Sequence, residues 1–322
     1  MSAYRPARPV LSLPVTVPRR LNPWTPLIAA TLGWASSAVM TRAVIVNGVG
    51  SFTLVPLRMS FALVSLLLIV AVSRRFWTTS KAAWGRGVVL GLVAMALPML
   101  LLTLALEDLP VSLGSLLIAL IPIATIAAAH FMVEDERFSP KSLPGLLLAL
   151  AGSAVLVGIG GESIAGVDNL WRGVAFSLAG VALAGLGGAL SRRFALQVPA
   201  EDLVLPQFTV NTVLLLSLVP LITDIDVASV SAESWALLAA IGVIGTTVPF
   251  ASFLIAAGIN PAYRLALTGY SVPVVAVTLA LIFLGERLTV PVVAGAVLIV
   301  AGVVLAERTT HHVPSPGVFE SR

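Results

Sequence analysis

The chain alternates between long apolar runs and short polar stretches. The apolar runs are rich in Leu, Val, Ile and Ala, and they lack the residue-by-residue alternation of barrel strands. About 20 apolar residues suffice to cross a bilayer as a helix, and a spanning segment must be helical or part of a closed barrel. The pattern therefore predicts ten transmembrane helices, over residues 25–46, 51–73, 84–105, 111–133, 143–160, 172–190, 203–222, 235–257, 262–284 and 290–306.

The chain also matches itself at one long offset. The pair Glu136-Arg137 recurs 150 residues later as Glu286-Arg287. Further matches at 150 or 151 residues are Gly145 and Gly295, Gly152 and Gly302, Pro56 and Pro206, Gly91 and Gly242, Pro98 and Pro249, and Pro122 and Pro273. So many matches at one offset predict a duplicated unit. We place the two copies at residues 25–160 and 161–306, between tails at 1–24 and 307–322.

Each copy contains five predicted helices, and five is an odd number. The second copy therefore enters the membrane from the opposite side. The predicted fold is an all-α polytopic membrane protein in which ten transmembrane helices form two inverted five-helix repeats. Inverted repeats are a recurring basis of secondary transport, with the substrate site near the midplane, and they also occur in channels. The symmetry thus favours permeation.

Composition excludes several other classes of protein. Only 11% of the residues are charged and 58% are hydrophobic. In a soluble domain about 25% of the residues are charged and about 45–50% are apolar. A soluble enzyme is therefore excluded. The chain has no cysteine and three histidines, which argues against thiol chemistry, disulfides and thiolate or histidine metal sites. We expect no cofactor and no bound metal.

The positive charges predict the orientation. Residues 1–24 are rich in Arg and Pro without an apolar core, and we interpret them as a disordered basic tail rather than a signal peptide. With the N-terminus inside, 15 of the 19 Lys and Arg residues lie on the cytoplasmic side, as the positive-inside rule requires. We expect a multi-pass protein of the cell inner membrane with both termini cytoplasmic. The basic pI then reflects topology and not a nucleic-acid partner.

Several residues carry a family resemblance. They are Gly33-Trp34, Pro56-Leu57-Arg58, the prolines at 122 and 273, and the two Glu-Arg turns, each followed by a Gly nine residues after its Glu. On these motifs the chain resembles the ten-helix, EamA-type members of the drug/metabolite transporter superfamily over residues 25–306, and within it the YddG amino-acid exporters. The resemblance implies a cavity enclosed by helices 1, 3, 4, 6, 8 and 9. Residues 25–41 contain no acid, unlike helix 1 of the four-helix multidrug members, so their proton exchange is disfavoured.

Weakly polar and aromatic side chains gather within the predicted helices. Hydroxyls beside aromatics suit a neutral or zwitterionic organic substrate better than a bare ion, and interhelical hydrogen bonding is the alternative. The candidate cavity residues are Trp34, Ser37, Met99, Ser115, Gly185, Thr246, Thr247, Phe250, Tyr270 and Ser271.

Four prolines and one arginine are further candidates. Pro98, Pro122, Pro249 and Pro273 interrupt helical hydrogen bonding, and we interpret them as hinges, with tolerated kinks as the alternative. Arg58 is the one charge well inside a span, where charges default to functional hypotheses. It could bind a carboxylate, or it could extend outward to the membrane surface.

The two Glu-Arg turns have a simpler interpretation. Glu136, Arg137, Glu286 and Arg287 precede predicted helices, where a negative charge is favoured at the helix start. We interpret them as structural turns, with gating or ion coupling as the alternative.

We therefore expect a secondary-type transporter, not an enzyme, that exports small metabolites by alternating access through a central cavity. Amino acids are the favoured substrates, and drugs or other amphiphilic metabolites are the alternative. A membrane-embedded lipid-modifying enzyme is the alternative of another class, but Asp224, Asp226 and the acids at 134–136 lack a nearby histidine. The expected partners are a small-molecule substrate and the bilayer, with the protein a monomer or weak homodimer.

Overall fold

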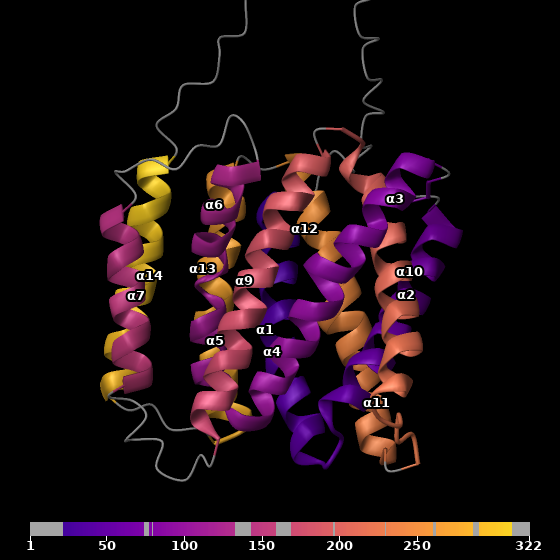
Figure 1. Cartoon of the computed structure of the whole chain (residues 1–322), viewed down its shortest axis with the longest axis horizontal. Helices are drawn as coiled ribbons and strands as arrows, with labels where there is room; N and C mark the ends of the chain where they lie inside the picture. The colour runs from indigo at the N-terminus through magenta and orange to yellow at the C-terminus, as the bar shows by residue number, and fades with distance from the viewer. Residues whose placement is uncertain are drawn as a thin grey trace, which may run out of the picture.

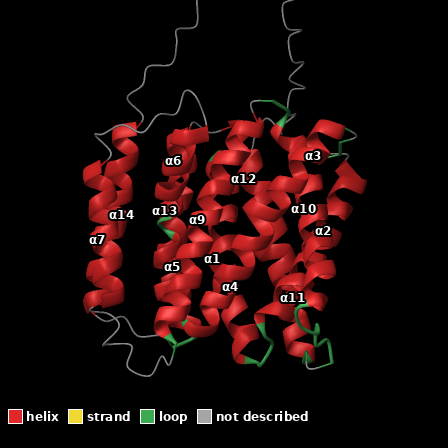
Figure 2. Ribbon diagram, viewed as in Figure 1, coloured by secondary structure: helices red, strands yellow, loops and turns green. Residues whose placement is uncertain are grey.

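The computed structural model describes residues 22–73, 77–78, 80–132, 143–158, 169–195, 197–228, 230–259, 262–285 and 290–310. This part of the chain consists of helices joined by loops and turns and has no strand (Figure 2). The elements are α1 (Trp24–Val46), α2 (Ser51–Ser73), α3 (Lys81–Leu90), η1 (Gly91–Ala96), α4 (Leu97–Asp108), α5 (Val111–Ile118), α6 (Ile121–Met132), α7 (Leu143–Gly158), α9 (Leu170–Ala195), α10 (Ala200–Leu218), η3 (Val219–Leu221), α11 (Ala232–Gly242), η4 (Val243–Thr247), α12 (Val248–Ile259), α13 (Ala262–Phe283) and α14 (Val290–Thr310).

These elements confirm the helices expected from hydropathy. Seven helical stretches of the described residues are long and apolar enough to cross a membrane. The third and eighth helices begin three residues earlier than predicted, at Lys81 and Ala232. The reason is a cap at equivalent places in the two halves. The Ser80 side chain accepts a hydrogen bond from the Ala83 N–H, and the Ser231 side chain accepts one from the Ser234 N–H.

The third and eighth helices also share a widened turn before their prolines. η1 and η4 are π-helical segments at equivalent positions, directly before Leu97-Pro98 and Val248-Pro249. The Leu97 N–H donates to the Leu92 carbonyl, five residues back instead of four. Proline removes one helical donor and disturbs the ladder, and a π-turn is one way to absorb that defect. The sequence predicted an interruption here but not its form.

The other two prolines differ from each other. The fourth helix is divided before Pro122 into α5 and α6, whereas α13 runs through Pro273 without a break. Equivalent prolines therefore do not produce equivalent geometry.

The two halves of the chain interlock. α1 packs against α12 and α13 of the second half, and α9 packs in the same way against α4 and α6 of the first. α2 packs against α11 and η4, and α10 correspondingly against α3 and η1. Each of these contacts therefore has a counterpart in which the two halves have swapped roles, as the predicted repeat symmetry requires. The inverted-repeat architecture is confirmed. Figure 1 shows the resulting bundle, with α7 and α14 together at one edge.

The α7–α14 pair is held by glycines at the predicted positions. A Cβ atom on Gly152 would lie 2.7 Å from the Ile299 nitrogen, and one on Gly302 would lie 2.4 Å from the Ala149 nitrogen. These two contacts are related by the 150-residue repeat. Absent side chains thus let the two backbones approach closely, which supports a scaffold role for this pair.

The symmetry fails at one important place. α4 contacts both α1 and α2, and α5 contacts α13. Within the described residues, the equivalent contacts of α12 with α9 and α10, and of α6 with α13, are nearly absent. We call the end of the bundle with α4 and α5 the closed side, and the end with α6, α12 and the start of α1 the open side. They are the lower and upper ends in Figure 1.

Candidate functional site

An apolar cluster seals the closed side. Val39 of α1, Leu106 of α4, Val111 of α5 and Ala280 of α13 form one buried group. The four residues come from four helices and from both halves of the chain. They bring α4 against α1 and α5 against α13, the two contacts whose counterparts are nearly absent among the described residues.

Hydrogen bonds and one ion pair reinforce this apolar seal at the end of α4. The Arg42 guanidinium of α1 donates to the Leu106 carbonyl and, at 3.0 Å, to the Glu107 carbonyl. The Glu107 carboxylate accepts from the Ser51 N–H at the start of α2, at 2.8 Å. Asp108 pairs with Arg172 of α9, at 2.7 Å. A cation at the end of α4 and a carboxylate at the start of α2 both suit the helix dipoles. We call Arg42, Ser51, Glu107, Asp108 and Arg172 the latch.

The carboxylates of the latch have no copy in the second half, although Arg42 does, because Arg192 lies 150 residues after it. The 150- and 151-residue offsets place Glu201 opposite Ser51, Gly258 opposite Glu107 and Ile259 opposite Asp108. The sequence therefore supplies the Glu107 and Asp108 carboxylates at one end of the bundle alone. This difference matches the closed and open sides of the structure.

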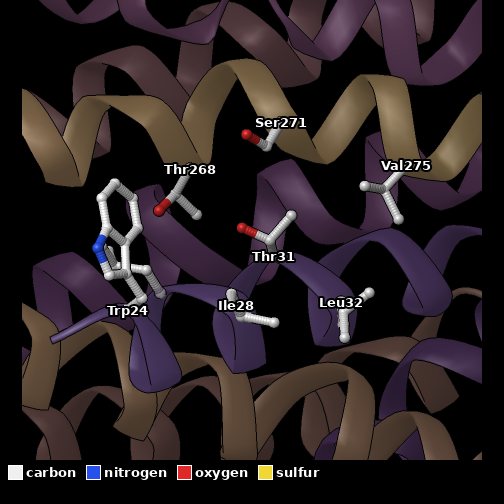
Figure 3. A pocket seen from close by; sticks show the side chains of 8 residues that line it. Trp24, Ile28, Thr31, Leu32, Thr268, Ser271 and Val275 are labelled. Atoms are coloured by element: carbon white, nitrogen blue, oxygen red, sulfur yellow. The ribbon is translucent and has the colours of Figure 1, made fainter. Parts of the chain in front are cut away.

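A groove lies between α1 and α13 toward the open side. Its volume is about 260 Å³, and Figure 3 shows its lining side chains. They are Trp24, Leu27, Ile28, Thr31 and Leu32 of α1, and Thr268, Ser271 and Val275 of α13.

The groove faces the space between the two halves. Leu32 precedes Val39 by seven residues, so the two share a face of α1. Val39 packs against Leu106 and Val111 across the closed side. The same face bears Ile28 and Leu32, which are 54% and 51% exposed. Their exposure shows that this face of α1 is uncovered toward the open side.

Three hydroxyls and the indole N–H of Trp24 are the polar side-chain groups among the described residues of the groove lining. Thr31, Thr268 and Ser271 lie near one another in Figure 3. Thr268 is 3% exposed, and its Oγ1 has no hydrogen-bond partner in the structure. Among the lining residues that the structure describes, none is charged. The site suits a solute with an apolar body and a net-neutral polar end.

A second polar cluster surrounds Arg58. Its Nη2 donates to Ser37 Oγ of α1 at 2.9 Å and to Thr246 Oγ1 of η4 at 3.0 Å. Its Nη1 donates to Thr41 Oγ1 at 3.4 Å. Arg58 is 6% exposed and its Nε has no partner. It therefore joins α1, α2 and the π-turn of helix eight, and it does not extend to the membrane surface.

The charge of Arg58 has no opposite charge among its described neighbours. Neither α1 nor α2 contains an acidic residue, and residues 234–259 contain none. Placing an Arg in the membrane interior costs at least about 2.5 kcal/mol. The equivalent cluster in the other half is Phe208, Met95 and Gly187, without a charge. The fold of this interface thus does not require a charge, which makes Arg58 a candidate functional residue.

Further candidates line the same interface. The Thr247 hydroxyl donates to the Ala62 carbonyl at 2.9 Å, and Ser65 donates to Thr247 at 2.7 Å. Phe250 contacts Phe208 edge to face, with ring centroids 5.3 Å apart. These contacts join η4 and α12 to α2 and α10. Much of the Thr247 and Phe250 side chains is therefore engaged in helix packing.

The structure separates the candidate residues into several places. Ser37 and Thr246 meet at Arg58, and Ser271 lines the groove. The rest lie elsewhere: Trp34 stacks on Phe253, Gly185 packs against Ala124, Ser115 is buried in α5, and Met99 packs against the core around Met59.

Other candidates fall outside what is described. Glu136, Arg137, Glu286 and Arg287 lie outside the described residues, as do the side chains of Tyr270, Pro122 and Pro273. Their predicted roles therefore stay predictions.

The candidate set omitted part of the groove and the latch. Trp24 and Thr31 line the groove from α1. The hydropathy of a residue does not show whether its side chain faces lipid or the interior of the bundle. Glu107 and Asp108 carry a better signal, because the repeat places Gly258 and Ile259 at the matching positions and so marks these carboxylates as a feature of one half.

Metal coordination has no candidate site in this part of the chain. Among the described residues, no three His, Asp or Glu side chains gather closely enough to hold an ion.

Comparison with known proteins decides the family. A model described as the EamA-like transporter family matches residues 26–158 and matches again at 171–307. The chain belongs to the EamA-like transporter family. The two matched segments are the two five-helix repeats, and the expectation of a transporter rather than an enzyme is confirmed by this EamA-like membership.

Two further similarities agree. The chain is 29% identical over 248 residues to a Bacillus subtilis (strain 168) protein named "Uncharacterized transporter YvbV", covering 74% of this chain and 77% of that protein. A solved structure described only as "Crystal structure of protein" matches with a TM-score of 0.62 and 22% identity, covering 92% of this chain and 99% of that one. The latter similarity supports the EamA-like fold alone.

Proposed function

We propose that this EamA-like transporter exports small metabolites, amino acids first, by alternating access between its inverted halves. The observation that supports the proposal is the unequal closure of two equivalent ends. Val39 and Leu106 of the first half pack with Ala280 of the second half at the closed side, whereas among the described residues the counterparts of the α1–α4 and α5–α13 contacts are nearly absent. The repeat symmetry predicts a second state, in which the closed side has opened and the open side has closed.

The exchange requires the latch to open. A neutral hydrogen bond contributes about 0.5–1.5 kcal/mol, and one to a charged group about 1.5–3 kcal/mol. The bonds made by Arg42 and Glu107 therefore favour the closed arrangement by only a few kcal/mol. Substrate that binds the exchanged state more tightly can supply a difference of this size.

We further propose that both termini lie in the cytoplasm of a cell whose inner membrane holds the protein. The start of α1 is at the open side, so the groove would take substrate from the cytoplasm. This direction of access agrees with export. The protein would work as a monomer or weak homodimer, because each half supplies the partner helices of the other.

The size of the groove favours metabolites over drugs. Sites for drug-sized ligands span roughly 300–1,000 Å³, and the groove measures about 260 Å³. A small solute such as an amino acid is the better match.

Flux into proteoliposomes tests the proposed function. We expect the purified protein to move labelled leucine and phenylalanine across the membrane down their concentration gradient. A pH gradient should have little effect, because α1, α2 and residues 234–259 contain no acid to carry a proton. Empty liposomes are the control. Absence of flux for every amino acid tested would contradict the proposal, and flux that requires the pH gradient would contradict its downhill mechanism.

A further inference from the structure

The groove between α1 and α13 has a polar middle and apolar ends. In Figure 3, Thr31, Thr268 and Ser271 lie between Trp24 on one side and Leu32 with Val275 on the other. The hydroxyls come from both helices. A ligand that contacts all three would therefore bridge α1 and α13.

Thr268 is the unusual member of this group. Its Oγ1 is buried without a hydrogen-bond partner, although hydroxyls in helices commonly bond the carbonyl four residues back. Thr278 of the same helix does so, donating to the Val274 carbonyl at 2.8 Å. An unpaired buried hydroxyl destabilises a protein, because it loses its hydrogen bonds to water without replacing them. Such a residue fits a site whose partner arrives with the ligand.

The charge of the lining restricts that partner. The lining residues that the structure describes carry hydroxyls and apolar groups and no ionised side chain. A net charge moved into these surroundings would be costly without an opposite charge, whereas a neutral polar group needs only hydrogen bonds. The three hydroxyls can both donate and accept them.

We propose that this groove is a selectivity subsite for net-neutral amphipathic substrates. The hydroxyls of Thr31, Thr268 and Ser271 hydrogen-bond the polar end, and Trp24, Leu32 and Val275 contact the apolar body. The inference rests on the proposed function, since it states which solutes such a transporter accepts. Leucine and phenylalanine belong to the accepted class, and lysine and glutamate do not.

Thr268→Val tests the subsite, because valine keeps the shape of threonine and removes the hydroxyl. We expect the ligand-free variant to melt no lower than the wild type. Leucine and phenylalanine should raise the melting midpoint, and the concentration that gives half of this rise should be about fivefold higher in the variant. A fivefold change corresponds to the loss of one hydrogen bond. Lysine and glutamate should stabilise neither protein.

Thr212→Val is the matched control. The Thr212 hydroxyl donates to the Phe208 and Met59 carbonyls, at 2.9 and 3.2 Å, and it lies outside the groove. This variant should melt lower and keep the wild-type response to leucine. If Thr268→Val also melts lower with an unchanged response, the hydroxyl is structural and the subsite is wrong.

The probe panel separates this inference from the transport proposal. It also contains 2-phenylethanol, a neutral amphipath that is not an amino acid. If 2-phenylethanol alone shows the Thr268→Val effect, the subsite stands and amino-acid transport fails. If leucine flux is normal in Thr268→Val, or if lysine binds as tightly as leucine, the subsite fails and transport stands. If no probe stabilises the protein, both are contradicted.

Discussion

Replacing Arg58 by leucine is expected to reduce flux about tenfold or more while the protein stays folded. Arg58 joins α1, α2 and η4 through Ser37, Thr41 and Thr246. A hydrogen bond to a charged group contributes about 1.5–3 kcal/mol, and about 1.4 kcal/mol corresponds to a tenfold change. Without these bonds, movement of α1 would no longer be transmitted to α2.

Stability should not fall with the flux. The substitution removes a buried charge that has no opposite charge among its described neighbours, and the Thr246 hydroxyl still donates to the Ile241 carbonyl, at 2.9 Å. The equivalent position in the other half is Phe208, an apolar residue buried in the core. Melting in detergent should therefore give a midpoint at or above that of the wild type.

Arg86→Leu provides a matched control. Arg86 is an exposed arginine of α3 whose guanidinium bonds Gln197, away from α1 and η4. Its loss should leave flux close to normal. Arg58→Lys should fall between the wild type and Arg58→Leu, because an ammonium cannot hold three separate partners in the planar geometry of a guanidinium. Full flux in Arg58→Leu would contradict the coupling role.

Replacing Gly187 by valine is expected to remove most of the folded protein from the membrane. A Cβ atom at Gly187 would lie 2.4 Å from the Ala94 Cα and 2.6 Å from its Cβ. These atoms belong to the η1 backbone or its first side-chain carbon, so they cannot rotate away. Overpacking commonly costs about 1–3 kcal/mol, and here the helices α9 and η1 must separate.

Gly85→Ala is the control for this substitution. Gly85 lies within α3, and a Cβ atom there would meet nothing within 4 Å. Alanine should stabilise the helix by roughly 0.5–1 kcal/mol. The comparison uses membrane yield and melting midpoint for both variants. Equal behaviour of the two would show that α9 and η1 do not pack as described.

The sequence was sufficient to predict the helices and their repeat. Each apolar run corresponds to a helical segment of the structure, because a bilayer leaves few alternatives for a spanning chain. The repeat also predicted which glycines pack, as Gly152 and Gly302 show. Helix starts were less accurate, since Ser80 and Ser231 extend α3 and α11 beyond their apolar residues.

The site itself was only partly predictable. Ser37, Arg58 and Thr246 are far apart in sequence, and only the packing of α1, α2 and η4 brings them together. The π-turns leave no trace in an apolar pattern. Thr268 looked like any hydroxyl in a helix, because its lack of a partner is a property of the folded chain.

The difference between the two sides was hidden for another reason. An inverted repeat specifies both arrangements, so the sequence alone does not say which end is closed. The latch carboxylates Glu107 and Asp108, which have no acidic counterpart 151 residues later, gave the one available indication.

Alternating access is tested most directly by distances measured at both ends of the bundle. The chain has no cysteine, so spin labels can be attached to introduced pairs without background. Positions 46 and 171, exposed at the ends of α1 and α9 on the closed side, form one pair. Positions 25 and 193, exposed on the open side, form the other.

The two distances should change in opposite directions when double electron–electron resonance compares leucine-free and leucine-saturated protein in lipid. A new population should appear in which 46–171 is longer and 25–193 is shorter. Distances that stay fixed under both conditions, or that lengthen together as in an opening channel, would contradict the account.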